Sequence, residues 1–295
     1  MRSRPEHVTD DAIRAAVVAG WGLDLDEFAF LPEGGGAYHW LARTADGRRW
    51  FVTCDDLETK PWLGSDHDTV MAGLLGAYGA AMDLRAAGAA FVVAPLPANS
   101  GAPAQRVDER HSVALFDHLD GTPGQWGQPL PPKDLRELVE MLALLHRSQT
   151  KQKVRRRGLE IPGRAQLEDA LAHLGGRWEG GPLSEAARAE LEANEDTVAT
   201  SLAALDRAAA HLTSEDQTLV LAHGEPHPGN LIRTSAGVRL VDWDTVSLAP
   251  PESDLWMIAE ADPELVPLYE QQTGIRLDPE VLKAFRLLWA TSDVA

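Results

Sequence analysis

The loop HGEPHPGN, residues 223–230, carries the side chains best suited to chemistry. Glu225 lies in this loop, Asn230 follows five residues later, and Asp242 comes next in the segment VDWD. A carboxylate within reach of a substrate hydroxyl can accept its proton as a general base. A side-chain amide oxygen and a nearby carboxylate form a hard-oxygen site suited to Mg²⁺, which keeps waters and bridges phosphates. The pattern predicts phosphoryl transfer, with Glu225 as the catalytic base and Asn230 and Asp242 as metal ligands.

A zinc site is the alternative interpretation of the same loop. His223 and His227 have the spacing of a metal pair on a helix, but Pro226 and Pro228 exclude a regular helix there. We expect His223 to hydrogen-bond neighbouring backbone and to brace the loop. A purely structural explanation of the acids is disfavoured, because proteins rarely bury carboxylates without a partner or a ligand.

The first half of the chain has the pattern of a β-rich region with two helices. Short β-rich runs flank Gly34, Gly35 and Gly36, which predicts a glycine-tipped hairpin. The other elements expected here are helices over 11–21 and 68–85 and strands over 48–54, 91–95 and 111–119.

The second half is expected to be mainly helical, with two short apolar strands around the loop HGEPHPGN. A Gly- and Pro-rich segment, 119–132, is expected to connect the two halves. The predicted helices cover 133–149 and 183–212, with two more within 263–290.

HGEPHPGN followed by VDWD resembles the aminoglycoside phosphotransferase and choline-kinase-like family, whose members typically read H-G-D-x-x-x-x-N and then I-D-W/F. The resemblance covers almost the whole chain and is strongest in the second half. It implies an α+β, bilobal protein-kinase-like fold, with a nucleotide-binding lobe over 1–119 and a helical lobe with catalytic loop and substrate site over 120–295. It also implies Mg²⁺-dependent transfer of the γ-phosphate of ATP or GTP to a small-molecule hydroxyl.

The family's motif positions carry over residue by residue. Glu225 stands at the position of the catalytic base, Asn230 and Asp242 at the metal ligands, and Asp254 at a position that braces the catalytic loop. The nucleotide positions implied by the resemblance are the phosphate-covering Gly34, Gly35 and Gly36 and the adenine-holding backbone from Asp117 to Leu119.

Two positions depart from the family pattern. Glu225 replaces an Asp, and its extra methylene shifts the carboxylate at a place where a misplacement of about 1 Å can change the rate about 10²-fold. Thr53 stands where the family has a phosphate-binding Lys on the third strand, and residues 70–85 offer only Asp83 as an acidic partner. Lys60 is the candidate replacement for nucleotide binding, with Arg48 and Arg49 as the other cations in reach.

The charge balance bears on the substrate. Among 295 residues, 27 Lys and Arg face 45 Asp and Glu, a formal net charge of −18, which repels nucleic acid and anionic membrane and attracts cations. Residues 251–295 hold nine acids against three bases. We expect a cationic small molecule, an aminoglycoside or a basic peptide antibiotic such as capreomycin, and hence antibiotic resistance. The expected substrate contacts are Asp244, Glu252, Glu260 and Asp262.

Location and partners follow from what the composition lacks. The sequence has no apolar leader, no 18-residue apolar run and one cysteine, so we expect a cytoplasmic monomer or homodimer that binds neither nucleic acid nor membrane. The short span between Asp242 and Glu252 favours a small molecule over a protein substrate.

Three hypotheses stay open at this point. The stretch 21–40 resembles spectinomycin-type phosphotransferases, and the HGE form resembles capreomycin-type kinases. A metabolic kinase for a sugar or amino alcohol is the first alternative. A catalytically silent kinase-like binding module is the second, motivated by Glu225 and Thr53.

Overall fold

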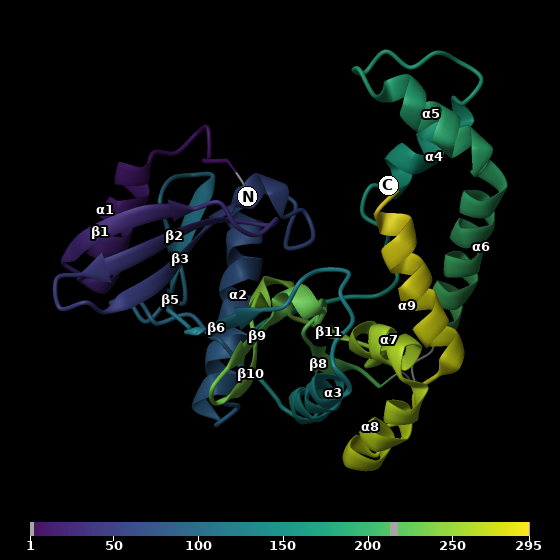
Figure 1. Cartoon of the computed structure of the whole chain (residues 1–295). Coiled ribbons are helices and arrows are strands. Elements are labelled where there is room, and N and C mark those ends of the chain that lie inside the picture. The colour runs from purple at the N-terminus through teal and green to yellow at the C-terminus, as the bar shows by residue number, and fades with distance from the viewer. Residues whose placement is uncertain (1–2, 213–217, 295) are drawn as a thin grey trace. The chain divides into compact units, whose positions relative to one another are not determined.

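The N-terminal part of the chain forms a five-stranded antiparallel sheet (Figure 1). The computed structural model describes residues 3–212 and 218–294. The strands follow the order β1-β2-β3-β5-β4. Their bounds are β1 Leu25–Leu31, β2 Tyr38–Thr44, β3 Arg49–Asp56, β4 Gln105–Arg106 and β5 His111–Asp117.

The register of this sheet aligns one row of buried side chains. Trp40 on β2 pairs with Val52 on β3, and Val52 pairs with Leu115 on β5. Helix α1, Asp10–Trp21, adds Ile13 and Val17 to the same core. Since successive side chains of a strand alternate between faces, this row fixes which β3 residues point away from the core.

Helix α2, His67–Ala86, begins at a capping box between Asp66 and Thr69. It packs closely on the chain at residue 153, because a Cβ at Gly76 would lie 2.2 Å from the carbonyl oxygen of Lys153. Helix α2 is preceded by the one-turn helix η1, Leu57–Thr59. The predicted helix over 68–85 is therefore confirmed.

The predicted strand over 91–95 is wrong. This segment stays outside the N-terminal sheet, where β4 takes the edge beside β5. Leu240 donates its N–H to the carbonyl of Phe91 and accepts one from the N–H of Val93 at 3.1 Å, so the run forms a single bridge, between Val92 and Leu240. The run packs against the strand before Asp242. A short apolar sequence looks the same whether it is buried in this way or as a strand of a sheet.

Two small sheets hold the loop HGEPHPGN. Strands β6 Gly121–Pro123, β9 Leu231–Thr234 and β10 Gly237–Leu240 pair in the order β10-β9-β6, and helix α3 spans Pro132–His146. The second sheet has the order β7-β11-β8, with β7 Arg155–Arg156, β11 Ser247–Ala249 and β8 Val220–Ala222.

The remaining helices have their own core, centred on Leu205, Phe285 and Leu288. Figure 1 shows α6 running alongside α9. The expected single helix over 183–212 is two helices, α5 and α6, because the chain leaves helical geometry at Asn194. The bounds are α4 Arg164–Ala172, α5 Ser184–Ala193, α6 Glu195–Leu212, α7 Glu252–Ala261, α8 Val266–Thr273 and α9 Pro279–Ser292, with the short η4 at Pro263–Leu265.

The chain packs into two compact units. The first combines Met1–Arg156 with Leu221–Leu248, and the second combines Arg157–Val220 with Ala249–Ala295. The expected lobe boundary at residues 119 and 120 stays a prediction. Among the residues described, no helix is both long and apolar enough to cross a membrane.

Candidate active site

The loop after β8 is braced by His223, which is fully buried. The backbone N–H of Glu225 donates to His223 Nδ1 at 3.3 Å, so Nε2 carries the proton and donates to the carbonyl of Val241 at 2.9 Å. Thr245 Oγ1 also donates to the carbonyl of His223 at 2.8 Å. One neutral histidine thus connects the backbone at Glu225 to the turn that carries Asp242.

Asn230 ends the one-turn helix η2, Pro228–Asn230, and its side chain is buried. Its Nδ2 donates to the carbonyl of Glu225 at 2.9 Å, and Val241 donates to the carbonyl of Asn230 at 2.9 Å. Because the amide nitrogen is committed to the loop, Oδ1 is the atom that can bind a cation. The half-buried Glu225 therefore has a backbone fixed from both His223 and Asn230.

Asp242 has a left-handed backbone, with φ 66° and ψ 63°. It is the one non-glycine residue with positive φ in the part of the chain that the structure describes. Such a conformation costs on the order of 1 kcal/mol, although Asp tolerates it better than most residues. The turn it starts, η3 Trp243–Thr245, is held by Trp243 Nε1 donating to the carbonyl of Leu240 at 2.8 Å.

Lys60 reaches into the same region from the end of η1 and is 1% exposed. Its Nζ lies 2.5 Å from Asp244 Oδ2 and 3.1 Å from Asp55 Oδ1, and it sits over the ring of Trp62. Burial alone would lower the pKa of this ammonium, but the carboxylates of Asp55 and Asp244 outweigh burial and raise the pKa. Lys60 is therefore charged.

The carboxylates here outnumber the cation. Burial raises the pKa of Asp55, an effect that Lys60 offsets only in part. Asp242 as a residue is exposed, and its pKa is nevertheless raised well above the ordinary value, by desolvation of the carboxyl and by the charge of Asp244. The site thus carries excess negative charge that a divalent cation would relieve.

These residues fit Mg²⁺. Hard oxygen donors are available at Asn230 Oδ1 and the Asp242 carboxylate, and the negative excess favours a cation. The described residues hold no cluster of three or more His, Cys, Asp or Glu side chains that could bind a metal. Mg²⁺ does not need such a cluster, because it typically keeps waters and binds one or two protein groups together with substrate phosphates.

The structure also places the predicted nucleotide residues. A Cβ at Gly34, which has φ +74°, would lie 2.8 Å from His39 Nε2, whereas Cβ atoms at Gly35 and Gly36 would enter open space. Asp117 ends β5 and is exposed, with an ion pair to Arg48. Half-buried Leu119 follows in the connection to β6.

The predicted bracing and substrate residues outside the loop lie in the second unit, apart from Asp244. Asp254 is buried in the first turn of α7. Glu252 is buried and accepts from the N–H of Asp278, Glu260 pairs with Arg286 at 3.0 Å, and Asp262 caps η4. Glu252, Glu260 and Asp262 each have a structural task. The bracing role of Asp254 and the roles of the others toward a substrate stay predictions.

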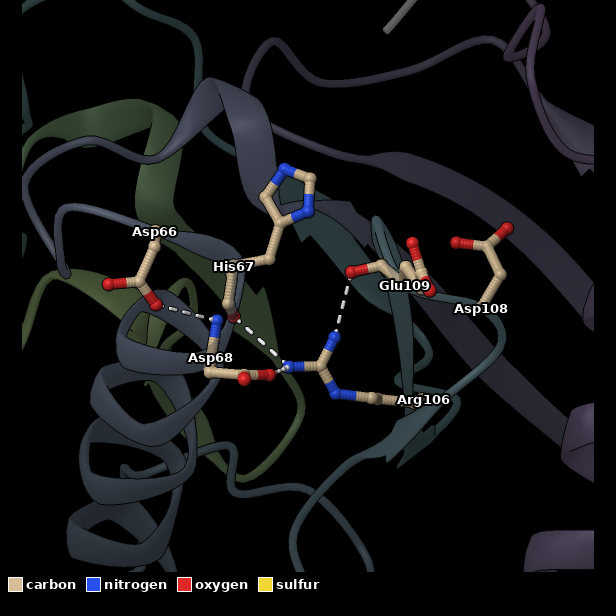
Figure 2. A pocket seen from close by; sticks show the side chains of 6 residues that line it. All are labelled: Asp66, His67, Asp68, Arg106, Asp108 and Glu109. Atoms are coloured by element: carbon tan, nitrogen blue, oxygen red, sulfur yellow. Dashed lines mark hydrogen bonds and ion pairs between the residues drawn. The ribbon is translucent and has the colours of Figure 1, made fainter.

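A pocket of about 540 Å³ lies at the start of α2, and none of the predicted site residues lines it. Figure 2 shows Arg106 at its centre, donating to the Asp68 carboxylate and to two carbonyl oxygens, those of His67 and Glu109. These bonds tie the β4–β5 connection to the helix start. We therefore regard the pocket as a structural feature separate from the candidate site.

Sequence reasoning missed Asp55 and Tyr78. Asp83 is the one acidic partner for Lys60 that the sequence offers on the helix, but it accepts from Thr150 Oγ1 and the N–H of Lys151 instead. Tyr78 Oη donates to Asp55 Oδ2 at 3.2 Å. The sequence does contain one signal, the two acids Asp55 and Asp56 that end β3. Neither an apolar nor an alternating strand pattern accounts for a buried charge at that position.

The chain shares its family with known phosphotransferases. A model of the phosphotransferase enzyme family, APH, matches residues 27–285. Protein StrN of Streptomyces griseus is 25% identical over 258 residues, which cover 83% of this chain and 74% of StrN.

Solved structures show the fold. The spectinomycin phosphotransferase APH(9)-Ia, in complex with ADP and spectinomycin, has a TM-score of 0.77 at 17% identity and covers 98% of this chain and 87% of its own. Choline kinase LicA from Streptococcus pneumoniae has a TM-score of 0.57 at 14% identity, covering 96% of this chain and 89% of its own. The predicted resemblance and the protein-kinase-like fold, an antiparallel sheet followed by a mainly helical region, are confirmed. The chain belongs to the phosphotransferase enzyme family and is a small-molecule kinase of that family.

Proposed function

We propose that the enzyme transfers the γ-phosphate of ATP or GTP to a hydroxyl of a small cationic antibiotic, with Mg²⁺ as cofactor, and so gives resistance. One observation supports the chemistry above all others. Glu225, Asn230 and the turn of Asp242 are tied together by His223 and by the Asn230 amide. A braced constellation of this kind suits a reaction that depends on positioning and on electrostatic stabilisation.

Glu225 has the role of general base in this proposal. The substrate hydroxyl oxygen attacks the γ-phosphorus, the bond from phosphorus to the bridging oxygen breaks, and the hydroxyl proton passes to the Glu225 carboxylate. The backbone of Glu225 is held from two sides, which fixes the point from which its longer side chain reaches toward the substrate hydroxyl.

Asn230 Oδ1 and the Asp242 carboxylate would hold the metal. When bound, Mg²⁺ neutralises charge on the phosphates and orients them. The left-handed backbone of Asp242 and the hydrogen bond from Trp243 Nε1 set the position from which the Asp242 side chain extends. The carboxylate of Asp242 therefore extends from a turn whose backbone is held by a hydrogen bond.

A cationic substrate is supported by charge and by one aromatic side chain. The net charge of −18 attracts cations from solution. Trp126, in the segment before α3, is 56% exposed and packs edge-on against the His227 ring at 4.6 Å. An indole beside the catalytic loop offers a face for a cation–π contact. The complex of APH(9)-Ia with spectinomycin supports the antibiotic class.

The proposal is tested with a panel of aminoglycosides, basic peptide antibiotics, sugars and amino alcohols, each incubated with ATP or GTP and Mg²⁺ and read by product mass. We expect phosphorylation of a cationic antibiotic. Phosphorylation confined to sugars or amino alcohols would identify a metabolic kinase instead. Nucleotide binding without turnover of any compound would identify a silent binding module.

The variant Glu225→Gln tests the catalytic base. It is nearly isosteric but cannot accept the proton, so kcat should fall about 10²–10⁴-fold while nucleotide affinity stays the same. Glu27→Gln, which changes an exposed carboxylate on β1 in the same unit, is the matched control and should have wild-type kcat. Near-wild-type kcat in Glu225→Gln would show that another group is the base.

A further inference from the structure

The ion pairs of Lys60 form part of a longer buried chain of polar contacts. Tyr78 on α2 donates to Asp55 Oδ2, Asp55 Oδ1 pairs with Lys60, and Lys60 pairs with Asp244. The side chains of Lys60 and Asp55 are each 1% exposed, and Tyr78 is also buried. The four groups come from three places: the end of β3 and its following turn, the middle of α2, and the turn after Asp242.

The two acids hold Lys60 in different ways. Asp55 Oδ2 accepts from the Tyr78 hydroxyl, and Asp55 Oδ1 lies at ion-pair distance from the ammonium, 3.1 Å, without a hydrogen bond to it. The backbone of Asp55 is part of the β3–β5 ladder. The described contacts of the Asp244 carboxylate are with Lys60 alone. Asp55 belongs to the sheet and Asp244 to the turn after Asp242, so two different elements hold Lys60.

Burial raises the pKa of the Tyr78 phenol well above its ordinary value, so the hydroxyl remains a donor at neutral pH. The Asp55 carboxylate, which accepts this hydrogen bond, therefore stays oriented. An ammonium has three N–H donors, and the described ion pairs account for two of them. Lys60 is 1% exposed, so a phosphate oxygen reaches its third donor only where the side chains that cover it open.

We propose that Asp55 and Tyr78 are positioning residues that hold Lys60 toward the nucleotide phosphates, with Asp55 as the fixed counter-charge and Tyr78 orienting it. This rests on the proposed function, in that the enzyme binds a nucleoside triphosphate. The lysine and its acid then belong to one strand and the turn after it, only five residues apart. Helix α2 contributes a hydroxyl and no charge, so the ion pair is complete without a helix-borne acid.

The test measures affinity for adenosine and for the non-hydrolysable analogue AMP-PNP, both with Mg²⁺, by calorimetry. Lys60→Met should weaken AMP-PNP binding about tenfold or more, the effect of one charge-assisted hydrogen bond, and should leave adenosine affinity within about twofold. Asp55→Asn and Tyr78→Phe should weaken AMP-PNP in the same selective way, Tyr78→Phe less than Asp55→Asn. Equal losses for adenosine and AMP-PNP would indicate a general structural defect and overturn the proposal.

A double-mutant cycle separates positioning from a direct role. If Asp55 and Tyr78 act through Lys60, then adding Asp55→Asn or Tyr78→Phe to Lys60→Met should cause no further loss of AMP-PNP affinity. Additive losses would overturn the proposal. Tyr78→Phe removes a single oxygen and keeps the ring contact with Phe116, so it provides the answer even where Asp55→Asn fails to fold.

Asp56→Asn is the matched control, because Asp56 is the next residue of the same strand and also a buried aspartate with a cationic partner, Arg110 at 2.6 Å. It should lower the urea midpoint without changing the ratio of AMP-PNP to adenosine affinity. If Asp55→Asn and Tyr78→Phe both bind AMP-PNP like wild type, the positioning proposal is wrong while the proposed function stands. If the wild-type enzyme binds neither ATP nor GTP, both fail.

Discussion

At the scale of single residues, the site concentrates negative charge that the fold itself does not neutralise. Asp55, Asp242 and Asp244 lie around one ammonium, and the pKa values of Asp55 and Asp242 are raised. Groups whose folded pKa is raised oppose folding at neutral pH, because the unfolded chain ionises them more easily. Such acids are retained for chemistry at the expense of stability.

We predict that Asp242→Asn abolishes Mg²⁺-dependent transfer while leaving the protein as stable as wild type or more so. Asn tolerates the left-handed backbone, and it removes a carboxylate that the folded state disfavours. Turnover and the urea midpoint should be measured on the same preparation. Asp83→Asn should have the opposite stability effect, because the hydrogen bonds from Thr150 and Lys151 overcome the desolvation of Asp83 and lower its pKa. A less stable Asp242→Asn would contradict this account.

A second residue-scale prediction concerns His39. Burial, with a contribution from Lys60, lowers the pKa of His39 to about 4. As pH falls from about 6.5 toward 4, the unfolded state takes up the proton first, so stability should fall through this window. In His39→Gln the urea midpoint should change less between pH 7 and pH 5 than in wild type. Equal pH slopes in both proteins would show that His39 does not titrate differently on folding.

At the scale of elements, the hairpin between β1 and β2 contains one glycine that the fold needs and two glycines that face open space. Gly34 has positive φ and contacts His39, so Gly34→Ala should lower the urea midpoint. Gly35→Val meets nothing within 4 Å and should keep wild-type stability, but it should weaken AMP-PNP binding if this tip covers the phosphates. Gly175→Val, at another open glycine in the second unit, is the control and should bind AMP-PNP normally. Unchanged affinity in Gly35→Val would remove the hairpin tip from the nucleotide site.

The elements that sequence predicted well are those with long periodic patterns. The helix over 68–85 and the strand over 111–119 were found because their apolar spacing is repeated over many residues. The run 91–95 was misjudged, since a short apolar run is buried equally well by one bridge to Leu240 as by a sheet. The break near Asn194 was missed because helical periodicity continues on both sides of it.

The sequence predicts the part of the candidate site that lies within one short stretch. It does not predict the part that depends on contacts between distant residues. Glu225, Asn230 and Asp242 lie within one short stretch whose spacing is visible in the sequence. Lys60 and Asp244 are 184 residues apart, and Tyr78 and Asp55 are 23 apart, with no periodic signal relating them. Nothing short of the three-dimensional packing brings a tyrosine hydroxyl to an acid at the end of β3.

At the scale of the whole molecule, the acidity of residues 251–295 is partly used within the second unit. Each of the three bases in this stretch pairs with an acid: Arg276 with Glu270, Lys283 with Glu280, and Arg286 with Glu260. Asp262 and Asp278 cap η4 and α9. The remaining excess acts on solutes mainly as a field, which salt screens.

We predict that kcat/KM for a polycationic substrate falls as salt rises, with Mg²⁺ and nucleotide held saturating. The screening length shrinks from about 10 Å at 0.1 M to about 3 Å at 1 M, so long-range attraction to a chain of net charge −18 is lost. Charge reversal at Glu260 should raise KM more than it lowers kcat, since such attraction is uniform binding. A flat salt profile would favour a neutral sugar as substrate.

The order in which the chain visits its two units has a consequence for how such enzymes diversify. Residues 157–220 leave the first unit after β7 and return to it through β8, and both strands flank β11 in one small sheet. The stretch is therefore an insertion whose two ends lie on either side of one strand, β11. Its helices share a core with α9, so residues 157–220 can change together with the C-terminal helices while Lys60, Glu225 and Asp242 keep their framework in the first unit. The helices of the second unit can in this way differ between relatives while the residues proposed for phosphoryl transfer stay the same.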